Sequence, residues 1–163
     1  MPQLAINEAY EKYLNAFFRD EEIPGGLSYK TALRQCKLDG TLESLKNIDR
    51  LLDHIRERHH PQFDEFLALQ ANQNFLYLLA FYTGNAIATT ADADLDWLPY
   101  DEFIEINPSA AGIWPRRFES SIICLIAKPS SNVKQMLPLV PIVIRLFEGP
   151  DEKSVWFSAA GFV

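Results

Sequence analysis

Six carboxylates and three aromatic rings alternate within one short stretch of the sequence, residues 92–105, which contains no lysine or arginine. The acids are Asp92, Asp94, Asp96, Asp101, Glu102 and Glu105, and the rings are Trp97, Tyr100 and Phe103. An acidic surface attracts a basic protein over a long range, and an aromatic ring anchors the partner after contact. The stretch therefore predicts a partner-binding surface in which the six acids steer the partner and Tyr100 anchors it.

The same stretch has two other interpretations. In the first, Trp97 and Phe103 face the core, and the acids form a solvated edge that discourages pairing with another sheet. In the second, the spacing of the first three acids opens a calcium-binding loop. That loop requires glycine at its sixth position and glutamate at its twelfth, where this chain has Trp97 and Phe103. We therefore predict no metal site here.

A second set of polar residues supports an alternative function, a small enzyme or ligand-binding protein with a pocket between helices and a sheet. These residues are His59, His60, Asp64, Tyr82 and Arg116. Adjacent histidines at the end of a helix are also typical of a C-terminal cap that the helix dipole favours. The chain has no glycine-rich phosphate loop. The prediction therefore leans against an enzyme, with no catalytic residue assigned and no cofactor.

Length, charge and cysteine content limit the classes of protein further. A chain of 163 residues with 48% hydrophobic residues predicts one globular domain, residues 1–163. The net charge of −7 disfavours nucleic acid and anionic membranes as partners and favours a basic protein. Two isolated cysteines and the polar N-terminal sequence are typical of a cytoplasmic protein. Assembly into a homo-oligomer stays open.

Hydrophobic spacing predicts an α+β fold. About three helices make an N-terminal helical half, which packs on a C-terminal, mostly antiparallel sheet of about four strands. The helices are expected at residues 4–19, from Thr41 as N-cap to about residue 60, and from about residue 62 to the high 80s. The apolar run Phe75–Tyr82 is too short to span a membrane, so it predicts a buried central helix in which Gly84 lets another backbone come close. The strands are expected at 95–106, 121–127, 139–147 and 154–162, the last two forming a hairpin.

The order of these features resembles a family of small uncharacterised bacterial α+β proteins. The resemblance covers roughly residues 40–162 through SLKNIDRLLDHIR, FYTGNAIA, DWLPYDEF and LPLVPIVIRLFEG. The size, acidity and α+β build are also similar to those of immunity proteins, which neutralise a toxin delivered between bacteria. These resemblances imply a non-enzymatic protein that covers a basic partner, such as a toxin domain with nuclease activity.

Overall fold

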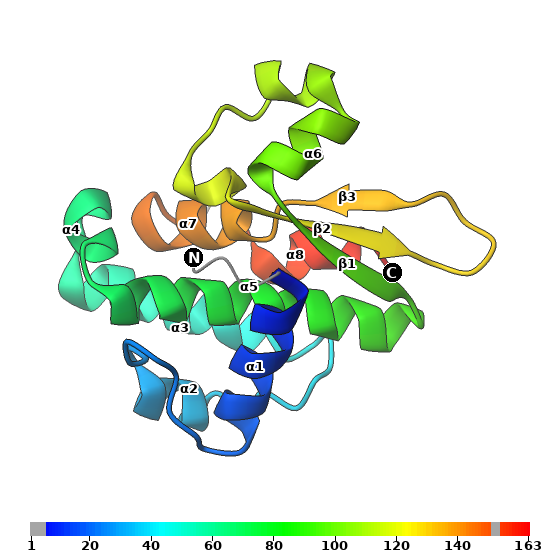
Figure 1. Ribbon diagram of the computed structural model, residues 1–163. Helices are drawn as coiled ribbons and strands as arrows, with labels where there is room; N and C mark the ends of the chain where they lie inside the picture. Colours follow the sequence, from blue (N-terminus) through cyan, green and yellow to red (C-terminus); the bar gives the residue numbers. More distant parts are fainter. Residues whose placement is uncertain (1–5, 151–153) are drawn as a thin grey trace.

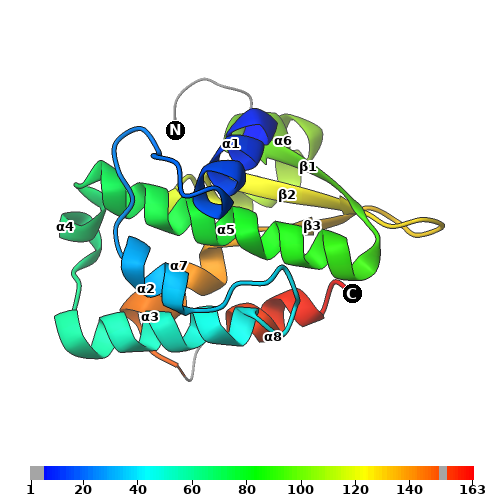
Figure 2. The ribbon, with the colours of Figure 1, turned by 90° about the horizontal axis from the view of Figure 1, so that it is seen from below.

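Helix α5 (Gln70–Ala91) forms the centre of the fold in the computed structural model, which describes residues 6–150 and 154–163 (Figure 1). Every side chain from Asn74 to Gly84 is buried, because apolar residues occupy all faces of this helix. Figure 2 shows α5 between the sheet and α1 on one side and α3, α7 and α8 on the other. The predicted buried central helix is therefore confirmed. Among the described helices, none has the length and apolar content needed to cross a membrane.

The N-terminal helices agree with the sequence prediction, apart from their ends. Helix α1 (Ile6–Phe18) matches the predicted helix at 4–19, whose first two residues lie outside the described part. A short helix α2 (Lys30–Gln35) follows. Helix α3 (Leu45–His59) begins after Ser44 and not after Thr41, because the backbone bonds before it span only three residues, as from the Ser44 amide to the Thr41 carbonyl oxygen at 3.2 Å. Thr41 Oγ1 accepts from the same amide at 3.2 Å, as the predicted N-cap would.

The third predicted helix is in fact two helices, α4 (Phe63–Leu67) and α5. Leu69 between them has an extended backbone. Two side chains from the first turn of α5 donate to the last carbonyl oxygens of α4: Asn72 to Phe66 at 2.9 Å and Gln73 to Leu67 at 2.7 Å. The carbonyls that lose helical partners at the break are therefore satisfied locally.

The sheet contains three antiparallel strands within the described residues: β1 (Asp94–Pro99), β2 (Ile122–Ala127) and β3 (Lys134–Met136), in the order β1-β2-β3. In this register Trp97 pairs with Cys124 and Cys124 with Met136, and all three side chains face the core. A Cβ built on Gly84 of α5 would lie 2.5 Å from Trp97 Cζ2. The element that comes close to Gly84 is therefore an indole ring, not the predicted backbone.

The prediction of about four strands, with all helices in the N-terminal half, was wrong. Residues predicted as the last two strands form helices α7 (Leu139–Phe147) and α8 (Val155–Ala160), so there is no hairpin between them. The buried residues of α7 recur at helical spacing, at Leu139, Ile142, Val143 and Leu146. Pro141 is tolerated because it lies in the first turn, where the amide has no helical partner. The β-branched content of this segment masked its helical period.

Polar contacts to α3 hold both C-terminal helices in place. Asp49 accepts hydrogen bonds from the Val155 amide at 2.7 Å and from Ser154 Oγ at 2.8 Å, at the start of α8. Asp53 accepts two bonds from the Arg145 guanidinium of α7, at 2.8 and 2.7 Å. These contacts cap α8 and join α7 to α3 in a partly buried ion pair.

The first predicted strand, 95–106, is also only partly correct. The strand ends at Pro99, and residues Tyr100–Ile106 form helix α6. Two 3-10 helices follow, η1 (Pro108–Gly112) and η2 (Phe118–Ser120). The predicted strand at 121–127 is confirmed as β2, whereas β3 lies in a polar stretch for which no element was predicted.

Candidate functional site

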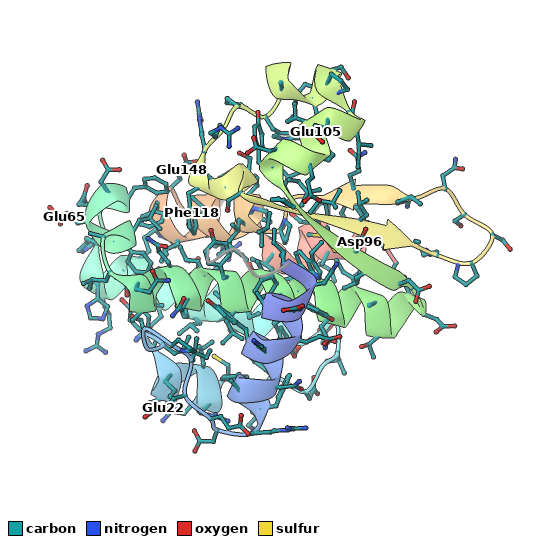
Figure 3. All side chains as sticks on the ribbon, viewed as in Figure 1. Glu22, Glu65, Asp96, Glu105, Phe118 and Glu148 are labelled. Atoms are coloured by element: carbon teal, nitrogen blue, oxygen red, sulfur yellow. The ribbon has the colours of Figure 1, made fainter. Side chains whose placement is uncertain are left out.

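The acidic segment, residues 92–105, passes over three consecutive elements. Asp92 ends α5 in a left-handed conformation (φ 51°), and Asp94 and Asp96 lie on alternate positions of β1. Asp101 and Glu102 belong to the first turn of α6, where the helix dipole favours negative charge. The chain turns from strand to helix at Pro99, whose extended backbone precedes α6. The acids therefore follow one continuous edge of the molecule, and Figure 3 labels Asp96 on β1 and Glu105 on α6.

All six carboxylates of the acidic segment are exposed. Asp101 forms an ion pair with Arg116, and this contact raises the pKa of the Arg116 guanidinium. Asp96 accepts a hydrogen bond from Asn7 Nδ2 at 2.9 Å. Within residues 6–150 and 154–163, no cationic side chain lies within ion-pair distance of the other five acids. The segment therefore presents a largely uncompensated negative charge.

Two of the three aromatic rings of the acidic segment are buried. Trp97 is 2% exposed and packs on Phe81, with ring centroids 5.1 Å apart. Phe103 is 1% exposed. This agrees with the interpretation in which both rings face the core.

The third ring, Tyr100, is half-buried and already has two partners. Its hydroxyl donates to the Trp114 carbonyl oxygen at 2.8 Å. The Arg116 guanidinium carbon lies 4.8 Å from the ring centroid. A partner that uses Tyr100 as an anchor would have to displace Arg116 from this face of the ring.

Helix α6 and η1, residues 100–113, stand out from the body of the molecule (Figure 1), and we call them the α6–η1 projection. The projection rests on its own small core, on the face of the sheet opposite α5. The buried members of this small core are Leu98, Phe103, Ala110, Ile123 and Leu137. This second core fixes the direction of α6 and thereby carries three of the six acids away from the main body.

Two isoleucines on the α6–η1 projection are large apolar groups that the sequence interpretation missed. Ile106 and Ile113 are each 68% exposed; Ile106 is the last residue of α6 and follows Glu105, and Ile113 follows η1. Apolar side chains exposed within a polar rim are one of the features of surfaces that bind protein partners. The sequence offered one signal for Ile106: Asn107-Pro108 follows it and ends the helix, so its side chain lies at a helix end, outside the small core.

The residues proposed for the alternative pocket do not converge. His59 and His60 are exposed at the end of α3, and Asp64 is exposed on α4. Tyr82 is 1% exposed, and its hydroxyl oxygen accepts a bond from the Gly40 amide at 2.8 Å and lies 2.6 Å from Ser44 Oγ. Arg116 lies beside the acidic segment, where it forms the ion pair with Asp101. Within the described residues, no group of three or more His, Cys, Asp or Glu side chains is placed to hold a metal ion.

Two hollows lie instead on either side of the loop after α1, along residues 21–24. One, of about 840 Å³, is lined by Tyr13, Arg19 and Gln70 among others, and the second, of about 580 Å³, by Phe17 and Lys30. Neither hollow includes any residue of the proposed pocket. Beneath the loop, buried Asn74 donates to the Pro24 and Gly26 carbonyl oxygens at 3.0 and 2.8 Å, so the loop is firmly attached to α5.

Comparisons of the chain with protein-family models, with curated proteins and with solved structures gave no match.

Proposed function

We propose that this chain is a non-enzymatic binding protein that covers a basic protein partner with its acidic segment. The observation that carries the proposal is the combination of six exposed carboxylates with two isoleucines that are each 68% exposed on the α6–η1 projection. Uncompensated charge steers a basic partner to the surface, and apolar groups then hold it by burial. The surface consists of Asp92, Asp94, Asp96, Tyr100, Asp101, Glu102 and Glu105, together with Ile106 and Ile113.

The burial of the aromatic residues shifts the anchoring role in this proposal from the rings to the isoleucines. Trp97 and Phe103 are structural, and the Tyr100 ring is covered on one face by Arg116. The isoleucines therefore take the larger part of the anchoring, and Tyr100 contributes after Arg116 has moved. In its most specific form, the proposal is a cytoplasmic immunity protein whose partner is a bacterial toxin domain with a basic active surface.

Two variants with the same change in net charge test the proposal. The site variant carries Asp94→Lys, Glu102→Lys and Glu105→Lys. The control variant carries Glu22→Lys, Glu65→Lys and Glu148→Lys, three exposed acids on other parts of the molecule (Figure 3). Each tagged protein is used to capture partners from a lysate of the source organism at low and high salt, and the captured protein is identified by mass spectrometry.

We expect the wild type and the control variant to capture one basic protein in stoichiometric amount and to release it at high salt. The site variant should lose it, with an association rate lower by about tenfold or more. Equal capture by the site and control variants would show that the acidic segment is not the binding surface. A captured protein without a basic surface would contradict the proposed class of partner.

A further inference from the structure

A third hollow, of about 370 Å³, lies between α2 and α3 and is lined by basic side chains. The two helices run beside each other in Figure 2, and the Asn47 side chain on α3 donates to the Cys36 carbonyl oxygen, just after α2, at 2.7 Å. Lys37, Arg50 and His54 all line the hollow. Arg50 and His54 are one turn apart on α3 and thus share a face of that helix. The lining contains no aspartate or glutamate.

The carboxylates on neighbouring elements already have other partners. Asp20 pairs with Lys30 and Arg34 at 3.2 and 3.0 Å. Asp53 pairs with Arg56 and Arg145 at 3.0 and 2.7 Å. Within the described ranges, no carboxylate lies within ion-pair distance of the three basic side chains of the hollow. A chain with 22 acidic residues against 15 lysines and arginines thus leaves two of these cations and His54 together, without an acidic partner in the described part of the chain.

Two further features of the hollow favour an anion: Arg50 is held in place by a neighbour, and the Cys36 thiol is neutral. Asn47 Oδ1 accepts a hydrogen bond from Arg50 Nη1, so one end of the guanidinium is held, and no other described residue accepts from its remaining N–H donors. Burial raises the pKa of the half-buried Cys36 thiol, which therefore stays protonated at neutral pH and does not repel an anion.

We propose that the hollow between α2 and α3 binds a phosphate group, presented either as inorganic phosphate or as a small phosphomonoester. The arginine fork matches two phosphate oxygens, and Lys37 adds a compact positive charge. The volume of about 370 Å³ lies at the lower end of the range for small-molecule sites, and Leu51 supplies an apolar wall. The site is independent of the acidic segment and of the partner proposed for it.

The test is a titration at low ionic strength with inorganic phosphate, with phenyl phosphate and with chloride at matched ionic strength. Binding is followed by the NMR shifts of backbone amides at residues 36–37 and 47–54. The variant Arg50→Ala is compared with Arg58→Ala, which removes the same charge from an exposed position of α3 outside the lining. Lys37→Asn is a second variant, because asparagine accepts the left-handed conformation (φ 52°) of this residue.

We expect saturable shifts with both phosphate compounds at millimolar concentration and none with chloride. Binding should weaken about tenfold in Arg50→Ala or Lys37→Asn and stay unchanged in Arg58→Ala. Tighter binding of phenyl phosphate would identify a phosphomonoester that contacts Leu51, and equal binding would identify the phosphate group alone. The absence of saturable shifts, or an equal loss in Arg58→Ala, would overturn the proposal.

Discussion

The core around α5 and the α6–η1 projection differ in which side chains they bury: the core buries even a polar one, whereas the projection leaves large apolar ones exposed. On α5, the polar side chain of Asn74 is 0% exposed and makes four hydrogen bonds. On the projection, two isoleucines are left 68% exposed above a core of five buried residues. Because burial supplies most of the free energy of folding, the first region must contribute far more stability than the second.

Under the proposed function, the core supplies the stability of the fold and the projection supplies the contacts with the partner. A large core tolerates a small projection whose surface is not optimised for folding. Exposed isoleucines cost solubility and contribute little stability where they are, which is a reason to look for their role in binding. Substitutions in each region, and at the contact between them, test this division.

The largest effect is expected for Asn74→Ala in the main core. Asn74 Oδ1 accepts from Tyr13 Oη at 3.0 Å and from Gln70 Nε2 at 2.9 Å, and its Nδ2 donates to two loop carbonyls. Removing this amide leaves the buried partners unsatisfied, and we expect a loss of about 3 kcal/mol or more in the free energy of unfolding. Urea unfolding measures it as a lower midpoint with an unchanged slope.

The neighbouring Gln73→Ala is the control for Asn74→Ala. Gln73 is only partly buried and donates one bond, to the Leu67 carbonyl oxygen at 2.7 Å. Its loss should cost about 1 kcal/mol. If the two variants were equally stable, Asn74 would not be the centre of attachment for the loop and α1.

A smaller effect is expected for Gly84→Ala, at the contact between α5 and β1. In an unconstrained helix interior, this change stabilises by about 1 kcal/mol. Here the new methyl group would lie 2.5 Å from Trp97 Cζ2 and 3.0 Å from Cη2, and both residues are buried. We therefore expect destabilisation by about 2 kcal/mol, measured by thermal or urea unfolding.

A double-mutant cycle with Trp97→Phe separates the steric effect from helix propensity. The smaller ring removes the atoms that clash, so Gly84→Ala should cost much less in the Trp97→Phe background than in the wild type. Equal costs in both backgrounds would mean that the indole does not limit residue 84.

The sequence predicted the secondary structure correctly where the spacing of hydrophobic residues fits only one type of element. The α3 stripe that includes Leu45, Ile48 and Leu52 fits only a helix, and the all-apolar run of α5 fits only burial. The sequence of α7 is compatible with both a strand and a helix. Its β-branched residues favour a strand, whereas its buried positions recur at helical spacing. Tertiary contacts decided between them, including Arg145 of α7 with Asp53 of α3.

The candidate site was predictable in charge but not in shape. The six acids of a stretch whose sequence contains no lysine or arginine are exposed, as a charged run is expected to be. The chain direction after Pro99 depends on the small core that Phe103 forms with Ile123 and Leu137, which are distant in sequence. Without that direction, neither the covered ring of Tyr100 nor the exposure of Ile106 and Ile113 can be deduced.

The smallest effect on stability is expected for the double variant Ile106→Ser, Ile113→Ser on the α6–η1 projection. Both side chains are 68% exposed, so the free energy of unfolding should change by no more than about 0.5 kcal/mol. The loss should appear in binding instead, as a dissociation rate from the captured partner that rises about tenfold, because anchoring contacts act mainly on dissociation.

Val133→Ser is the control for these isoleucines, because Val133 is 57% exposed just before β3, away from the projection. It should leave both the stability and the dissociation rate unchanged. A cost above about 1 kcal/mol in the isoleucine variant would mean that these side chains belong to the small core, and the projection would then be a structural element. If the isoleucine variant were stable and dissociated at the normal rate, the isoleucines would not anchor the partner. The core and the projection would then differ only in their contribution to stability.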